Sequence, residues 1–117
     1  MDATEPRWLE LADGCRLAVD DRGYLLDPAD WNEALATELA RRDGIELGAE
    51  HWQVIHLLRS YHQCHGRSPA MRLLVKEAAQ ALGTGVANSR VLYRLFPQGP
   101  AKQAARYAGL PRPTSCI

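Results

Sequence analysis

The sequence has few cysteines and lacks the common cofactor-binding motifs. Its 117 residues include three cysteines, Cys15, Cys64 and Cys116, and no CxxC pair. An odd number of widely spaced cysteines argues against a disulfide framework and against a zinc ribbon, so we expect thiols. There is also no GxGxxG, Walker or HExxH motif. Nucleotide-dependent catalysis is therefore unsupported, and we expect neither a cofactor nor a bound metal.

Long apolar runs are absent as well. No stretch approaches the roughly 18 consecutive apolar residues of a membrane span, and the first five residues are acidic rather than signal-like. We therefore expect a cytoplasmic protein without a membrane partner. With 46% hydrophobic and 24% charged residues, the composition is typical of one globular domain. A chain of this length buries roughly two thirds of its unfolded surface, which is enough for one core.

Acidic residues are almost missing from the second half of the chain. Fourteen Lys and Arg balance fourteen Asp and Glu, but residues 1–50 hold 13 of the acids and 5 of the bases. Residues 51–117 hold only Glu77 against 9 bases, so the halves carry net charges of −8 and +8. Either the fold brings the halves together and they neutralise each other, or one of them contacts an outside polyanion or acidic protein.

The N-terminal region predicts a small β-hairpin. We expect residues 15–19 and 24–26 to be its strands, joined by a turn at 20–23, and the first 13 residues to be mostly irregular. Five helices follow, bounded by Asp, Ser or Asn caps, first-turn prolines and closing glycines. They are expected after Asp27 as far as Gly44, over 49–65, after Ser68 as far as Gly83, from Asn88 to Pro97, and over 101–108. The fold class is mostly α (α+β), a bundle-like domain of about five helices.

All four histidines lie on the second long helix. His62 and His65, one turn apart, could supply two metal ligands, but no carboxylate or further cysteine has matching spacing. Packing histidines with polar tips are the favoured interpretation. Cys64 and Cys15 are interpreted as packed or incidental thiols.

Cys116 is the most informative residue of the sequence. It is the penultimate residue and follows two prolines that favour an extended path, and no acidic residue occurs after Glu77. A reactive thiol needs exposure and positive surroundings, and a chain end supplies exposure. The carboxylate of Ile117, one residue away, opposes thiolate formation. The alternative is a stray thiol on a frayed tail.

Basic residues recur along the last three helices in pairs one turn apart, which are Arg72 with Lys76, Arg90 with Arg94, and Lys102 with Arg106. They can form a patch for phosphates, for an acidic partner or for a thiolate. A solvated helix face explains them equally well.

Several ordered segments together resemble the DsrC/TusE sulfur-carrier family. The resemblance runs from about residue 8 to the end, and its C-terminal part is the most specific. It rests on DRGYL (21–25), Trp31, IEL (45–47) before His51 and Trp52, SPAMR (68–72), LFPQGPAKQA (95–104) and AGLPRPTSCI (108–117).

The resemblance implies one helical domain, 1–109, with a hairpin and a flexible C-terminal arm, 110–117. In such proteins the penultimate cysteine, here Cys116, accepts sulfane sulfur as a persulfide and passes it on. The branch that acts with dissimilatory sulfite reductase has a second arm cysteine, where this chain has Ala105. The difference favours the TusE-like branch, and a single arm thiol must wait for a partner's thiol to release its sulfur.

This branch implies a sulfurtransferase that works as a relay protein, without independent turnover. Its expected partners are a TusBCD-like sulfur donor and an MnmA-like tRNA thiolase that makes 2-thiouridine at the tRNA wobble position, with tRNA contacted only indirectly. We expect Arg72 and Lys76 to support the thiolate or persulfide anion of Cys116. Two alternatives remain: a nucleic-acid-binding module that uses the basic C-terminal helices, and a regulatory protein of sulfur metabolism.

Overall fold

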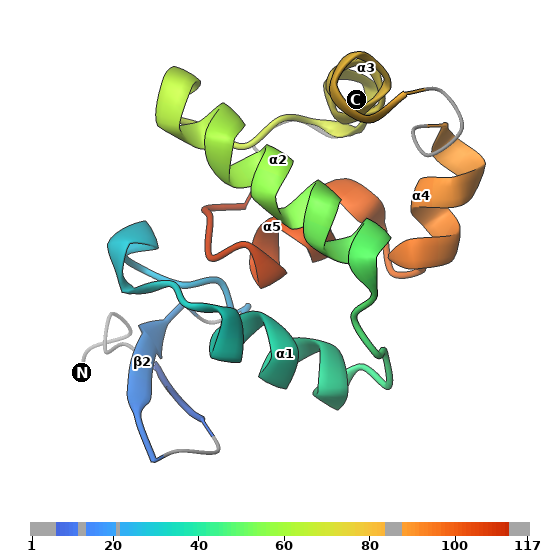
Figure 1. Ribbon diagram of the computed structural model, residues 1–117. Helices are drawn as coiled ribbons and strands as arrows, with labels where there is room; N and C mark the ends of the chain where they lie inside the picture. Colours follow the sequence, from blue (N-terminus) through green and yellow to red (C-terminus); the bar gives the residue numbers. More distant parts are fainter. Residues whose placement is uncertain (1–6, 12–13, 21, 84–87, 113–117) are drawn as a thin grey trace.

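The computed structural model describes residues 7–11, 14–20, 22–83 and 88–112. Within these ranges the chain forms one two-stranded sheet, a short 3-10 helix and five α-helices, as shown in Figure 1. Their bounds are β1 (Arg7–Glu10), β2 (Arg16–Val19), the 3-10 helix η1 (Pro28–Asp30), α1 (Glu33–Arg42), α2 (Ala49–His65), α3 (Met71–Leu82), α4 (Ser89–Leu95) and α5 (Pro100–Tyr107). The expected class, mostly helical with a small N-terminal hairpin, is confirmed. No helix in the described ranges is both long and apolar enough to cross a membrane.

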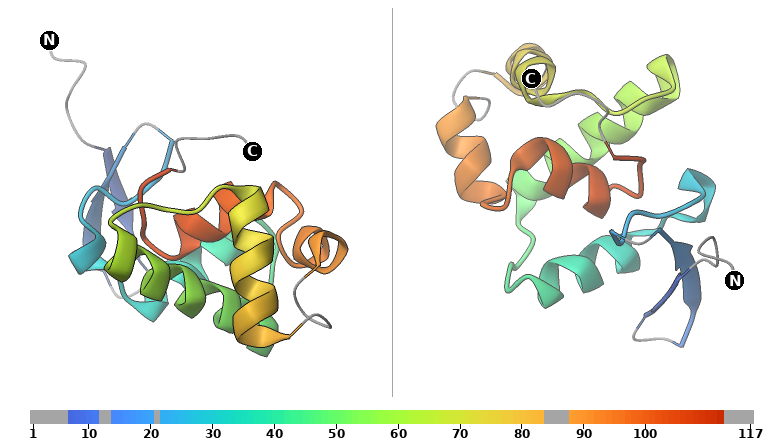
Figure 2. Two further views of the ribbon diagram at one scale, coloured as in Figure 1. Left: turned by 90° about the horizontal axis from the view of Figure 1, so that it is seen from above. Right: turned by 180° about the vertical axis from the view of Figure 1, so that it is seen from behind.

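Helix α5 is the centre of the fold. It contacts α1, α2, α3 and α4, and the views from above and behind place it between them (Figure 2). Ala104 and Ala105 are fully buried, and such small side chains let the surrounding helices approach closely. Tyr107, also fully buried, packs on Phe96 with ring centroids 5.9 Å apart. The last helix is therefore held by the rest of the core, and the chain leaves the core directly after it.

The hairpin differs from the predicted one. Strand β1 pairs antiparallel with β2, with Leu9 opposite Leu17, so the expectation of an irregular start was wrong over residues 7–10. The predicted partner at 24–26 contributes a bridge between Val19 and Leu25 and two hydrogen bonds, from Leu26 N to Ala18 O and from Asp20 N to Tyr24 O. The exposed Arg7, Trp8 and Glu10 surround a single buried Leu9, which gives too weak an apolar alternation to reveal a strand.

The first α-helix begins later than predicted. Asp27 does cap a helical turn, since its side chain accepts a hydrogen bond from Ala29 N, but this turn is the 3-10 helix η1. Asn32 is the N-cap of α1, and Trp31 lies between the two elements rather than on the helix face. The helix ends at Arg42, two residues before Gly44, whose φ of 77° is the left-handed conformation that closes a helix.

The other helices follow the prediction closely. Helix α2 ends at Gly66 in the left-handed conformation and buries Val54, Ile55, Leu58 and Tyr61. Asn88 caps α4 through a hydrogen bond from Val91 N. Ser68, however, does not cap α3, because Ala70 is the N-cap and the Ser68 hydroxyl bonds elsewhere.

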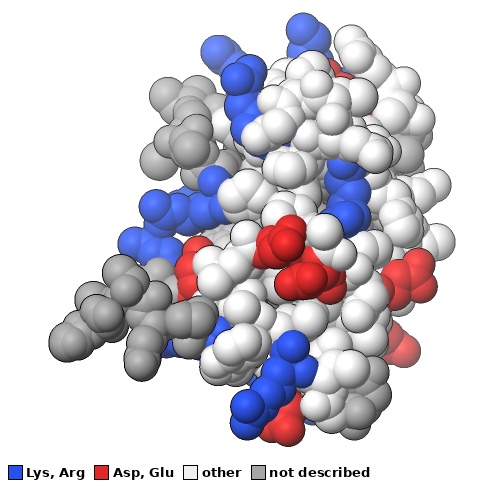
Figure 3. Space-filling view, turned by 90° about the vertical axis from the view of Figure 1, so that its left-hand side faces the viewer, with Lys and Arg blue, Asp and Glu red and all other residues white. Residues whose placement is uncertain are grey.

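The two oppositely charged halves of the sequence are interleaved in space. Helices α1 and α2 both pack on α5, and Arg106 forms an ion pair with Asp43 across the halves, with Nη2 and Oδ2 2.5 Å apart. On the face in Figure 3, Lys and Arg side chains lie above and to the left of a central group of Asp and Glu side chains. The two halves thus neutralise each other only in part, and much of the basic charge faces solvent.

Candidate functional site: the root of the C-terminal arm

The predicted sulfur-carrying residue, Cys116, lies outside the described residues. The structure does describe the segment from which its arm departs, residues 108–112, which we call the arm root. Three residues of the root, Ala108, Gly109 and Leu110, are buried, whereas Pro111 and Arg112 are exposed. The candidate site is therefore the set of residues that hold the arm root in place.

Local backbone geometry ends α5 and turns the chain into the arm. Gly109 has φ 70°, its N–H donates to Arg106 O at 3.2 Å, and Leu110 N donates to Ala105 O at 3.0 Å. This pair of hydrogen bonds around a left-handed glycine is a Schellman motif. Both Leu110 and Ala105 are buried, which supplies the apolar contact that accompanies the motif. The end of α5 is consequently fixed by its own sequence as well as by packing.

Trp31 packs against this turn. Its indole Nε1 donates to the carbonyl of Tyr107 at 2.8 Å. A Cβ on Gly109 would lie 2.5 Å from Cδ1 of the indole, so only glycine fits at this position. The segment between η1 and α1 thereby fixes the last carbonyl of α5 and the first residue of the arm turn.

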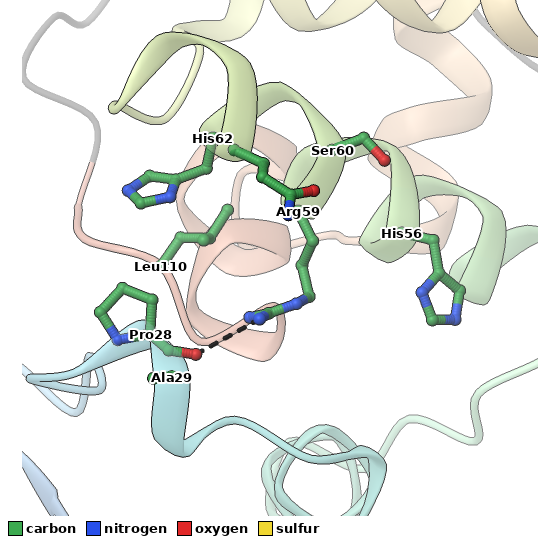
Figure 4. A pocket seen from close by; sticks show the side chains of 8 residues that line it. Pro28, Ala29, His56, Arg59, Ser60, His62 and Leu110 are labelled. Atoms are coloured by element: carbon green, nitrogen blue, oxygen red, sulfur yellow. Dashed lines mark hydrogen bonds between the residues drawn. The ribbon is translucent and has the colours of Figure 1, made fainter.

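Arg59 joins α2, η1 and the arm root. Its Nη1 donates to Ala108 O at 2.7 Å and its Nη2 to Pro28 O at 3.3 Å, and its guanidinium lies 4.3 Å from the Trp31 ring centroid. Burial lowers the pKa of Arg59, but an arginine pKa is high enough that the side chain stays charged. In Figure 4 the side chain extends from α2 to the Pro28 carbonyl. The Arg59 guanidinium thus bonds to two backbone carbonyls, Ala108 O at the arm root and Pro28 O, which also accepts the Trp31 N–H.

Ser68 holds the arm one residue further on. Its hydroxyl is buried and donates to the carbonyl of Pro111 at 2.6 Å. Ser68 precedes α3, so this hydrogen bond attaches the arm to the connection between α2 and α3. Beyond Pro111, no contact within the described residues restrains the backbone of the arm.

A small pocket opens beside the arm root. Its volume is about 280 Å³, and it lies between η1 and α2, as shown in Figure 4. It is lined by Pro28, Ala29, His56, Arg59, Ser60, His62, Gln63 and Leu110. His62 lies beside Leu110, where the chain leaves the core, whereas His56 lines the opposite end of the pocket (Figure 4).

The carboxylate of Asp43 also holds α5 in place. Asp43 Oδ2 accepts from Arg106 Nη2 and from the Tyr107 hydroxyl, both at 2.5 Å, and lies 3.4 Å from Gln103 Nε2. Burial and the neighbouring Asp43 carboxylate raise the pKa of Tyr107, so the phenol stays protonated and donates. These contacts tie the end of α1 to α5.

The predicted supporting residues Arg72 and Lys76 are exposed and lie one turn apart on α3. The histidines mostly pack: His51 Nδ1 accepts from Gly48 N at 3.1 Å, and its Nε2 lies 3.0 Å from Leu95 O. A neutral ring with its proton on Nε2 satisfies both contacts. In the described ranges no three His, Cys, Asp or Glu side chains gather as metal ligands would. Cys15 and Cys64 are both exposed, so of the two expected possibilities, packed or incidental thiols, packing is excluded.

Three residues that hold the arm root were missed as site residues. Arg59 belongs to none of the basic pairs noted in the sequence, Ser68 was taken for a helix cap, and Trp31 was expected within the first helix. Only the resemblance included two of them, in the Trp31 and SPAMR segments. No local pattern marks a side chain that bonds to a carbonyl more than 40 residues away.

The comparisons with known proteins agree with this geometry. The family described as "DsrC like protein" matches residues 12–117. The protein named "Sulfurtransferase TusE" of Sodalis glossinidius is 54% identical over 104 residues, which cover 89% of this chain and 96% of that protein. The protein of the same name from Salmonella typhimurium is 50% identical over 105 residues, which cover 90% of this chain and 96% of its own.

Two solved structures share the fold. The NMR structure of Allochromatium vinosum DsrC has a TM-score of 0.87 and 45% identity, and the match covers 97% of this chain and all of that one. The crystal structure of the oxidized gamma-subunit of the dissimilatory sulfite reductase (DsrC) from Archaeoglobus fulgidus has a TM-score of 0.78 and 40% identity, covering 95% and 100%. Because sequence and fold agree over nearly the whole chain, this protein belongs to the DsrC-like family.

Proposed function

We propose that this chain is a sulfurtransferase of a sulfur relay, in which Cys116 carries sulfur toward 2-thiouridine at the tRNA wobble position. The observation that carries the proposal is the 50–54% identity, over nearly the full length of both chains, to proteins named Sulfurtransferase TusE. The penultimate cysteine and the firmly held arm root support it, because a relay needs a thiol that extends from a rigid body.

The transfer requires no net oxidation. The thiolate of Cys116 attacks the outer sulfur of a donor persulfide, a new S–S bond forms on Cys116, and the donor's S–S bond breaks to release its thiolate. In the second step an acceptor thiolate attacks the outer sulfur in turn, and Cys116 leaves as the thiolate. Each step exchanges one S–S bond for another, so no cofactor is needed.

Position 105 bears on which branch of the family the chain represents. Ala105 is fully buried, and its carbonyl accepts the Leu110 N–H that closes the arm turn. With alanine there, no second arm thiol is available to form a disulfide with Cys116. The sulfur can then leave only to a partner, which favours the relay role.

The partners and compartment follow from the same proposal. The donor is a TusBCD-like complex and the acceptor an MnmA-like tRNA thiolase, and the protein works in the cytoplasm, where tRNA is modified. We take residues 1–109 as the helical domain and 110–117 as the arm that carries the thiol. Arg72 and Lys76 of α3 favour the thiolate or persulfide anion of Cys116.

Mass spectrometry tests the central claim. The protein is incubated with cysteine, a cysteine desulfurase system and the TusBCD-like donor complex, and the intact mass is recorded before and after reduction. We expect the wild type to gain one reducible sulfur atom and Cys116→Ser to gain none, with unchanged helical content. Cys64→Ser is the matched control, since it removes an exposed thiol from α2. A sulfur adduct that persists in Cys116→Ser would refute the proposal.

The nucleic-acid-binding alternative is not favoured. The names of the relatives describe sulfur transfer, and no observation separately supports a regulatory role.

A further inference from the structure

A second hollow, on the other side of the arm root, is lined almost entirely by cationic and amide side chains. We call it the basic pocket, and its volume is about 200 Å³. The residues that matter for the argument are Arg22, Tyr24, Lys102, Gln103, Arg106 and Arg112. They come from the turn after β2, from α5 and from the arm root, so the fold rather than a charged run in the sequence brings them together.

The turn after β2 is built onto the pocket. Asp20 Oδ1 accepts hydrogen bonds from Arg22 N at 2.8 Å and Tyr24 N at 2.9 Å, which fixes the turn backbone. Gly23 has φ 88°, and a Cβ there would lie 3.7 Å from Cδ of Arg106, so the turn covers the stem of that side chain. The Tyr24 hydroxyl donates to Lys102 O at 3.3 Å. The cations of the turn and of α5 therefore face the same space.

Among the described residues, the positive charge that lines the pocket exceeds the negative charge near it. Arg106 is paired with Asp43, but in the part of the chain that the structure describes, Arg22, Lys102 and Arg112 form no ion pair. Burial raises the pKa of Tyr24, and the charges of Arg106, Arg112 and Arg22 oppose that rise, whereas Asp20 adds to it. Nε of Arg106 is buried and has no hydrogen-bond partner among the described residues.

The dimensions and donors of the pocket limit the ligand. Sites for drug-sized molecules typically measure about 300–1,000 Å³, so this pocket fits a group of few atoms. Guanidinium groups bind phosphate oxygens with two parallel hydrogen bonds, and three of them converge here beside an ammonium group. We propose that the basic pocket binds a phosphate group, either free phosphate or a phosphate of a nucleic-acid backbone.

This site goes beyond the sulfur relay and does not depend on it. Arg112 belongs to the arm, so a bound phosphate also joins the arm to α5 and to the β2 turn. The site can therefore be tested without any sulfur chemistry, in protein that carries Cys116→Ser. If Cys116 failed as a sulfur carrier, phosphate binding would be measured in the same way.

The test compares two double variants in that background. Arg22→Gln with Lys102→Gln removes two cations of the pocket, and the control, Arg90→Gln with Arg94→Gln, removes two exposed cations of α4. Lys102, Arg90 and Arg94 lie on helix surfaces, and Arg22 is exposed on the turn. Both double variants should therefore fold, which thermal melting will verify. Inorganic phosphate is titrated while amide shifts are followed by NMR. A fluorescent RNA stem–loop is titrated by anisotropy, with and without phosphate.

We expect saturable phosphate-dependent shifts at the amides of Gly23 and Lys102, and at least about tenfold weaker binding in the pocket variant. The control should bind like the parent. If the RNA also binds, is displaced by phosphate and binds more weakly to the pocket variant, the ligand is a phosphate of a nucleic-acid backbone. If the RNA does not bind in this way, the ligand is free phosphate. Absence of saturable shifts at the pocket, or an equal loss in both double variants, overturns the proposal.

Discussion

Trp31 and Gly109 are in such close contact that the indole ring occupies the space of a side chain at position 109, with Cδ1 2.5 Å from where a Cβ would be. The same indole donates to Tyr107 O and lies against the Arg59 guanidinium. One aromatic ring thus fixes the end of α5 and the start of the arm together. Residues 108–110 of the arm root therefore belong to the core, even though they end a helix.

Gly109→Ala should destabilise the protein strongly. Gly109 and Gly44 both close a helix with positive φ, 70° and 77°, and alanine pays about 1–2 kcal/mol for that conformation. Nothing lies within 4 Å of a Cβ on Gly44, whereas Gly109 meets Trp31. We expect Gly44→Ala to lower the free energy of unfolding by about 1 kcal/mol and Gly109→Ala by about 3 kcal/mol or more. Urea denaturation measures both, and equal losses would contradict the close contact.

Ser68→Ala should loosen the arm without unfolding the body. The change removes the hydrogen bond to Pro111 O, which is the last restraint on the described arm backbone. Because Pro111 is exposed, water can replace the lost donor, and we expect less than about 1.5 kcal/mol of lost stability. The order parameter of the Arg112 amide from ¹⁵N relaxation should fall. Ser89→Ala, an exposed serine of α4, is the control, and identical Arg112 dynamics in both variants would count against this restraint.

Arg72→Ala with Lys76→Ala tests whether α3 supports the thiolate of Cys116. If these charges favour the anion, alkylation of Cys116 should slow about two- to fivefold, as expected for charge interactions at a surface, and sulfur loading should fall. Arg90→Ala with Arg94→Ala removes an equally spaced pair from α4. Unchanged alkylation and loading in the α3 variant would exclude this role.

Glu38 should make stability depend on pH in the acid range. Hydrogen bonds from Arg41 and then Arg42 lower its pKa from 4.5 to about 2. Between those values the unfolded state binds more protons, so this contribution is complete above pH 4.5 and is lost as the pH falls toward 2. Glu38→Gln should flatten that part of the stability curve. Glu46→Gln, an exposed carboxylate for which the structure shows no ion pair among the described residues, should leave it unchanged. Denaturation at a series of pH values decides between them.

The sequence predicted the helices best where local chemistry decides their ends. Asn88 and the left-handed Gly66 act through neighbouring backbone groups, and both were predicted correctly. Asp27 was also predicted correctly to be a cap, but a cap does not reveal whether a 3-10 helix or an α-helix follows. Strand β1 was missed because its stability comes from pairing with β2, which its own residues do not show.

The site was predictable only in part. The family, and with it the role expected of Cys116, came from the resemblance of the whole set of segments. The contacts of Arg59 and Ser68 with the arm root depend on packing between segments about 40 to 50 residues apart, and a helical wheel contains no such information. The basic pocket was likewise hidden, because Arg22 and Arg112 meet Lys102 only in the folded chain.

The anchorage of Pro111 sets a geometric limit on every exchange of sulfur. Cys116 is the fifth residue after Pro111, and a fully extended chain spans at most about 3.6 Å per residue, so the Cα of Cys116 can lie at most roughly 18 Å from that of Pro111. A donor or acceptor whose own thiol lies deeper than this must bring its surface against the body around Ser68 and Trp31. The length of the arm beyond Pro111 therefore limits how deep a partner's reactive thiol can lie in its active site.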